Sequence, residues 1–94
     1  MLCSTWKGGS FGIRVGNANA QKYFQKKWTE IEVIIDGKHH FFDLTKTFWT
    51  TCHEFRGKEI GIWLRKHGLD RWPKGRPHKV KLISLGSNKF KLLK

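Results

Sequence analysis

The sequence predicts an α+β fold: a small mixed, mostly antiparallel sheet or open pseudobarrel of about five strands, with two or three short helices. Three observations predict it. Apolar residues alternate with polar ones in several short segments, turn residues separate those segments, and two intervening stretches carry apolar residues at helical spacing. We expect residues 1–10, which include the stretch WKGGS, to be a flexible N-terminal arm, and residues 11–94 to form one domain.

The first part of that domain is expected to be a strand followed by a short helix. In FGIRV, at 11–15, alternate apolar side chains fall on one face, which is typical of a strand. Residues 16–28 open with Gly and Asn, and we expect Asn17 or Asn19 to cap a short helix there.

Residues 29–45 and 79–94 each predict a β-hairpin. The first has the turn dipeptide Asp36-Gly37, and the second turns around Gly86-Ser87-Asn88. In both hairpins apolar residues alternate with polar or charged ones, so one face should be buried. The side chains expected on the buried faces are Ile31, Val33, Ile35, Phe42, Leu44, Val80, Leu82, Phe90 and Leu92.

Residues 45–70 lose the two-residue period and predict two short helices. Thr45 or Thr47 can cap a helical turn that holds an aromatic pair, and Gly68 stands where a second helix would stop. The apolar residues at helical spacing are Phe48 and Trp49 in the first helix, and Ile60, Trp63 and Leu64 in the second.

The formal charge of +12 is concentrated at the two ends of the chain. Residues 1–28 hold five Lys or Arg and residues 71–94 hold eight, without a single acid, whereas residues 29–70 hold six against all seven acids. If the terminal segments are adjacent in the fold, their charges merge into one basic face. Such an excess of positive charge usually reflects a polyanionic partner.

Catalytic and metal-binding patterns are weak, so we expect no enzyme, no cofactor and no metal. Cys52 and His53 are adjacent and poorly arranged to hold one ion. Glu30, Glu32 and Asp36 share a strand face that should be solvated, which leaves a metal-dependent nuclease as a distant alternative. With two cysteines, no disulfide framework, and no apolar run of roughly 18 residues, the sequence favours a cytoplasmic protein without a membrane partner.

The connection DRWPKGRPH, at 70–78, combines stiffness with charge. Pro73 and Pro77 restrict the backbone before the strand that follows, while its basic residues are not needed for a turn. We therefore expect a rigid connection that also carries part of an anion-binding surface. Its contributing residues are Arg71, Trp72, Lys74 and Arg76.

Other nucleic-acid contacts are expected from basic and polar residues elsewhere in the chain, because Lys and Arg neutralise phosphates while Arg and Asn can read base edges. Phosphate contacts are expected from Lys7, Lys22, Lys26, Lys27, Lys74 and Arg76, and base contacts from Arg14, Asn17, Asn19 or Arg56. Trp6 and Trp72, next to basic residues and Gly or Pro, are the tryptophans expected at the surface, and Trp49 is left open.

The order of these segments resembles the plant-type "B-three" DNA-binding pseudobarrel, which is also used by the specificity domains of some restriction endonucleases. The segments that carry the resemblance are GIRVGNANAQKYF, IEVIIDGKHHFFDL, GKEIGIWLRKHGL and HKVKLISLGSNKFKLL. The resemblance implies binding of duplex DNA by two arms that embrace the major groove. One arm would comprise Trp6 to Ser10, and the other about Lys46 to Arg56, which includes Trp49.

The sequence thus favours a non-catalytic nucleic-acid-binding domain, with duplex DNA ahead of RNA. Two alternatives stay open. The first is an RNA or single-strand binder that stacks bases on exposed tryptophans. The second is a small interaction protein whose basic face meets an acidic protein.

Overall fold

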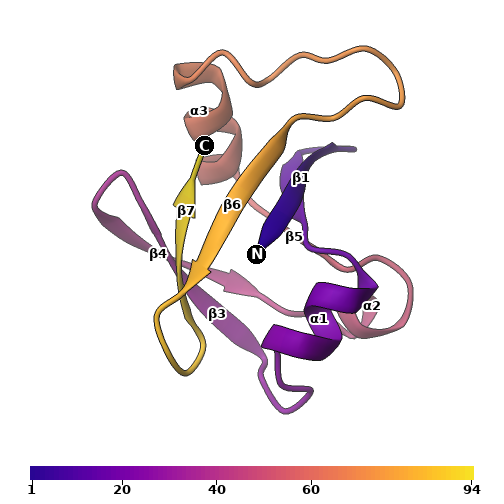
Figure 1. Cartoon of the computed structure of the whole chain (residues 1–94), viewed down its shortest axis with the longest axis vertical. Helices are drawn as coiled ribbons and strands as arrows, with labels where there is room; N and C mark the ends of the chain where they lie inside the picture. The colour runs from indigo at the N-terminus through magenta and orange to yellow at the C-terminus, as the bar shows by residue number, and fades with distance from the viewer.

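The computed structural model describes all 94 residues and contains a seven-stranded sheet nearly closed into an open barrel, with three short helices (Figure 1). The strands are β1 (Leu2–Lys7), β2 (Phe11–Arg14), β3 (Glu30–Ile35), β4 (Lys38–Asp43), β5 (Glu54–Arg56), β6 (Lys79–Ser84) and β7 (Lys89–Leu93). The helices are α1 (Asn17–Tyr23), α2 (Lys46–Thr50) and α3 (Lys58–Lys66). The predicted α+β open barrel is confirmed, with more strands than expected. None of the helices combines the length and the apolar character needed to cross a membrane.

The sheet runs in the order β4-β3-β7-β6-β1-β2-β5, and every pair is antiparallel except β3 with β7. The two edge strands, β4 and β5, meet through side chains: the rings of Phe42 and Phe55 lie 5.2 Å apart between centroids. Because no ladder joins them, the barrel stays open along this seam. Figure 1 shows α3 at one end of the barrel, and α1 and α2 near the other.

The core follows the alternation of the strands. Every inward residue predicted for the two hairpins is buried, and Phe90 lies at the centre with its ring stacked on Phe24 at 4.9 Å. Trp28 packs edge-on against the same ring at 6.3 Å. Ile60, Trp63 and Leu64 of α3 are buried, as their helical spacing predicted, and they close one end of the barrel.

Both hairpin turns use backbone conformations that their residues tolerate. Asp36 and Gly37 have φ of 50° and 80°, which is the two-residue turn whose twist matches the adjoining strands. Gly86 and Ser87, at 97° and 48°, turn the chain between β6 and β7. Gly68, at φ 69°, follows the end of α3 as expected.

The expected arm at residues 1–10 is replaced by a strand. Leu2–Lys7 forms β1, which pairs with β6 on one side and with β2 on the other. The N-terminal ammonium donates to the Leu82 carbonyl at 2.8 Å, and the amide of Thr5 donates to the His78 carbonyl at 2.9 Å. These backbone bonds hold a segment whose side chains give little sign of a strand. They also bring the N-terminal strand beside the C-terminal hairpin.

A second unexpected strand is β5. Helix α2 ends at Thr50, and Glu54–Arg56 then pairs with β2. Its inward residue, Phe55, is fully buried. The helical interpretation of KTFWTTCHEF therefore holds only for its first half.

Replacing Phe90 with alanine is expected to lower the free energy of unfolding by about 3–5 kcal/mol, because a fully buried aromatic ring leaves a cavity. The matched control is Phe41→Ala, which removes the same atoms from a side chain that is 64 % exposed and should cost less than about 1 kcal/mol. Urea unfolding followed by circular dichroism measures both. Equal losses would contradict the position of Phe90 in the core.

Cys3 should resist alkylation in the folded protein. It points into the core from β1, and burial raises the pKa of its thiol to about 11 in spite of the nearby N-terminal ammonium and Lys79. At about pH 8 the thiol is protonated, so iodoacetamide should modify only the half-buried Cys52, whereas both react in denaturant.

The same shift makes stability depend on pH. Because the pKa of Cys3 is raised on folding, its contribution to stability is complete below the unfolded pKa and is lost as pH rises toward about 11. Mass spectrometry of labelled peptides checks the resistance of Cys3 to alkylation, and urea unfolding at a series of pH values checks the stability. Rapid labelling of Cys3 near neutral pH, with the fold intact, would show that it is not buried.

Candidate functional site

Three parts of the chain that are distant in sequence meet beside the loop between β1 and β2. They are the facing ends of β1 and β2, one side of α3, and the connection after α3. Two clefts lie here and share Lys7, Asp70 and Arg71. The first, about 700 Å³, we name the loop–α3 cleft, and the second, about 600 Å³, the Trp6–Trp72 cleft.

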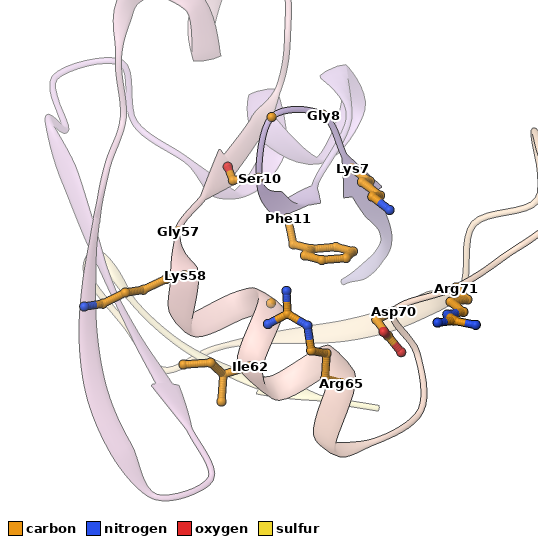
Figure 2. Close-up of a pocket in the computed structure, with 12 residues that line it drawn as sticks. Lys7, Gly8, Ser10, Phe11, Gly57, Lys58, Ile62, Arg65, Asp70 and Arg71 are labelled. Carbon is orange, nitrogen blue, oxygen red and sulfur yellow. The ribbon is translucent and has the colours of Figure 1, made fainter.

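The loop–α3 cleft is bounded by the β1–β2 loop on one side and by α3 on the other (Figure 2). Phe11 lies between them, and the charges of Lys7 and Arg65 each sit 5.4 Å from the centroid of its ring. Its other lining residues are Gly8, Gly9, Ser10, Gly57, Lys58, Gly61, Ile62, Asp70 and Arg71. Figure 2 shows Lys58 extending away from the ring, so the cations that face it are Lys7 and Arg65.

Gly61 makes this arrangement sterically possible. A Cβ at that position would come within 3.0 Å of Cδ2 of Phe11 and 3.6 Å of a terminal nitrogen of Arg65. The helix can therefore approach the ring closely, and the guanidinium can lie across it. A glycine within a short helix costs up to about 1 kcal/mol relative to alanine, which is consistent with a packing requirement here.

The Trp6–Trp72 cleft lies on the outer surface of β1 and β2, against the connection after α3. Trp6 crosses Gly12 of the neighbouring strand and meets the Arg56 guanidinium at 4.9 Å from its ring. Its far edge touches Gly8, where a Cβ would lie only 2.3 Å from the indole. The lining residues are Thr5, Trp6, Lys7, Arg14, Asp70, Arg71, Trp72 and Pro77.

Arg14 is held in this cleft by Glu54 of β5. Its Nε and a terminal nitrogen both donate to one carboxylate oxygen, at 3.2 and 3.0 Å. The Glu54 side chain is 2 % exposed whereas that of Arg14 is 50 % exposed. The pair therefore neutralises a buried carboxylate while leaving part of the guanidinium in solvent.

The other cations at this site have no acidic partner. The ion pairs of the molecule join Glu54 to Arg14, Glu32 to Lys89, and Asp36 to Lys66, and the rings of His39 and His67 also contact Glu32 and Asp36. Lys7, Arg56, Arg65 and Arg71 have no carboxylate within 4.0 Å. Asp70 is the one acid common to both clefts, so the positive charge here is largely uncompensated.

Of the residues predicted to bind nucleic acid, six come together around these clefts: Trp6, Lys7, Arg14, Arg56, Arg71 and Trp72. Trp72 is half-buried, with its ring edge-on to Phe11 at 6.3 Å and to His78 at 6.0 Å. Lys74 and Arg76 are exposed on the same connection and line neither cleft.

The remaining candidates lie elsewhere. Figure 1 places α1 and α2, which carry Lys22 and Lys46, away from α3, and Lys26 and Lys27 follow α1. Asn17 is exposed, at the start of α1. Asn19 has a structural role: its amide donates to the carbonyls of Leu2 and Val15, both at 2.9 Å. Trp49 packs on Phe48 at 4.9 Å and adjoins the core, so it is no open stacking surface.

Residues that sequence reasoning missed are Phe11 as a support for cations, Arg65, Lys58 and Asp70. One signal was present, because Lys58, Ile62 and Arg65 fall on one face of the predicted second helix. The role of Phe11 depended on β1, which was not predicted. No three His, Cys, Asp or Glu side chains gather to form a metal site.

Gly12→Ala tests how the Trp6 side of the site is built. The new Cβ would lie 2.7 Å from the backbone oxygen of Phe55, which cannot move freely, so we expect a loss of about 1–3 kcal/mol in unfolding free energy. Trp6 should also shift, because it lies 3.2 Å from the same position, and near-ultraviolet circular dichroism reports that change. The control is Gly9→Ala, where no atom lies within 4 Å. Equal effects of the two changes would refute this packing.

No protein-family model matches the chain, and no curated protein or solved structure shows significant similarity to it. What the protein binds must therefore be inferred from the chemistry of these side chains.

Proposed function

We propose that the protein is a non-catalytic domain that binds duplex DNA through the surface around its β1–β2 loop. The observation that carries this proposal is the convergence of Lys7, Arg56, Arg65 and Arg71, all without acidic partners, beside a short glycine-rich loop. Like-charged groups gathered from separate segments raise the energy of the free protein. A polyanion removes that cost and releases its own counterions.

Duplex DNA is favoured over a single strand because the tryptophans here offer little free ring surface. Trp6 is contacted by Arg56, Gly8 and Gly12, and Trp72 is half-buried with its ring against Phe11. Binding of single strands relies on aromatic faces on which successive bases stack. Charges and guanidinium groups suit phosphates and groove edges better than unstacked bases.

The resemblance to the DNA-binding pseudobarrel adds further support. The resemblance implies a first arm at Trp6–Ser10, and the loop that follows β1 lies within that segment. Its second arm was expected at about Lys46–Arg56, and this segment contains α2 and β5. The end of that segment, Arg56, lies against Trp6. We therefore propose that the first arm and Arg56 contact DNA together.

One observation favours a second candidate, an acidic protein partner. On the outer surface of β1, β6 and β7, the exposed Leu2, Ile83 and Leu93 are interspersed with lysines, and Lys81 pairs in register with Leu2 and Leu93. Apolar and basic groups together suit a protein surface rather than DNA. This patch is separate from the two clefts, so variants can distinguish the two functions.

The test is fluorescence anisotropy with labelled duplex DNA, single-stranded DNA and RNA of one sequence, over a series of salt concentrations. A variant with Lys7, Arg56 and Arg71 all changed to Gln is expected to bind duplex at least about tenfold more weakly, with a salt slope reduced by about 3. The control changes Lys38, Lys91 and Lys94 to Gln, which removes the same charge elsewhere. It should lower the affinity for duplex DNA by less than about threefold.

Equal losses in the two variants would show that affinity depends on net charge alone and would overturn the site. Tighter binding of the single strand, with quenching of tryptophan fluorescence, would favour the stacking alternative. If none of the three nucleic acids binds at low salt, the proposed function is wrong, and a protein partner becomes the leading candidate.

A further inference from the structure

We propose that the loop–α3 cleft is a discrete pocket for a single phosphate group carried on nucleic acid, within the surface proposed to meet the duplex. The inference rests on the proposed function for the source of the phosphate. The chemistry of the pocket can be tested without DNA. Three observations support the proposed pocket. Two cations are held on one aromatic ring, donors in the adjoining loop make no hydrogen bond within the protein, and the cleft has room for a phosphate.

The two cations are preorganised. Lys7 and Arg65 both lie 5.4 Å from the centroid of Phe11, and neither has a carboxylate partner. The ring restricts both long side chains before a ligand arrives, so less conformational entropy is lost on binding. Because Gly61 has no side chain, the helix packs closely on the ring and the Arg65 guanidinium can lie over it. Both charges are therefore held at the same ring, one from β1 and one from α3.

The β1–β2 loop supplies neutral donors at the edge of the same cleft. The amide of Gly8 donates to the Ser10 carbonyl at 2.9 Å and closes the turn. The amides of Gly9 and Ser10 make no hydrogen bond within the protein, and neither does the Ser10 hydroxyl. Small residues let a ligand approach this backbone closely. Backbone amides next to cations are a common arrangement for binding phosphate oxygens.

The same features favour a phosphate over a base. Both cations lie over Phe11, so the ring is not free to stack on a nucleobase. Arg65 and Arg71 present guanidinium forks, which match the oxygens of a phosphate. A volume of about 700 Å³ accepts a phosphate with its sugar but not a duplex.

The negative charge of Asp70 opposes the binding of an anion, so a variant without it should bind phosphate more tightly. It is the one acid that lines the cleft, against Lys7, Lys58, Arg65 and Arg71. Figure 2 shows its carboxylate on the same side of the cleft as Arg65 and Arg71. Removing it should strengthen phosphate binding, whereas removing a cation should weaken it.

The first experiment titrates the ¹⁵N-labelled full chain with inorganic pyrophosphate at low salt. The expected result is chemical-shift changes concentrated in residues 8–11 and 57–65. Lys7→Gln and Arg65→Gln should each weaken binding by about fivefold or more, and Asp70→Asn should tighten it by about twofold or more. Lys38→Gln and Lys91→Gln are the matched controls and should leave the affinity unchanged. Unaltered thermal unfolding of each variant shows that the fold is intact.

Shift changes spread over every lysine-bearing segment, or equal losses in the variants and their controls, would overturn the pocket. Weaker pyrophosphate binding by the Asp70→Asn variant would also overturn the pocket. These outcomes do not depend on DNA, so they separate failure of the pocket from failure of the proposed function. Conversely, localised pyrophosphate binding without any DNA binding would support the pocket chemistry and refute DNA as the source of the phosphate.

The second experiment identifies the source by comparing duplexes with 5′-phosphate and 5′-hydroxyl ends. If the pocket holds a terminal phosphate, the phosphorylated duplex binds more tightly and Arg65→Gln abolishes that difference. If it holds an internal phosphate, the two duplexes bind equally and Arg65→Gln lowers the salt slope by about 1 for both. If Arg65→Gln affects neither affinity nor slope for either duplex, the pocket does not serve DNA, and the proposal is overturned.

Discussion

Strand β1 joins the two parts of the barrel, and the candidate site depends on it. It is the only strand that hydrogen-bonds both to the group β4-β3-β7-β6 and to the group β2-β5. Thr5 reinforces this joint, because its amide donates to the His78 carbonyl and its hydroxyl accepts the His78 amide at 3.0 Å. The next two residues, Trp6 and Lys7, line the candidate site. The same six residues thus close the fold and carry the side chains proposed to bind, so stability must be measured beside affinity for any change in β1.

The distribution of ion pairs explains how a chain of charge +12 leaves its cations unpaired at one place. Asp36, at the β3–β4 turn, accepts a hydrogen bond from Lys66 of α3, which is the main cause of the lowered pKa of this carboxyl group. Glu32 of β3 is engaged by His39 and Lys89. These acids stabilise contacts between β3 and its neighbours. They are therefore not available to neutralise the basic groups around the β1–β2 loop.

Sequence patterns were sufficient to predict the elements that depend only on contacts between residues close together in the chain. Alternation with Asp36-Gly37 predicted β3 and β4, because a hairpin needs only its own residues. Strand β1 was missed because its buried side chains, Cys3 and Thr5, are no more apolar than Leu2 and Trp6 on its outer face. Strand β5 has one inward residue, Phe55, and pairing with β2 defines it. Both strands depend on partners far along the chain, which no local period reveals, and the same is true of the parallel pairing of β3 with β7.

The sequence could predict several residues of the candidate site, but not that they lie together in the fold. Lys7, Arg56 and Arg71 could be chosen as basic residues beside aromatic or flexible ones, yet their proximity requires both unexpected strands. Lys7 and Arg71 line both clefts, and the loop of residues 8–10 lies at their side. A sugar–phosphate backbone passing this loop could therefore meet the cations of one cleft and then those of the other. The shared cations would make the two contacts mutually dependent, so the loop geometry, rather than the total charge, would determine how a nucleic acid is oriented on the barrel.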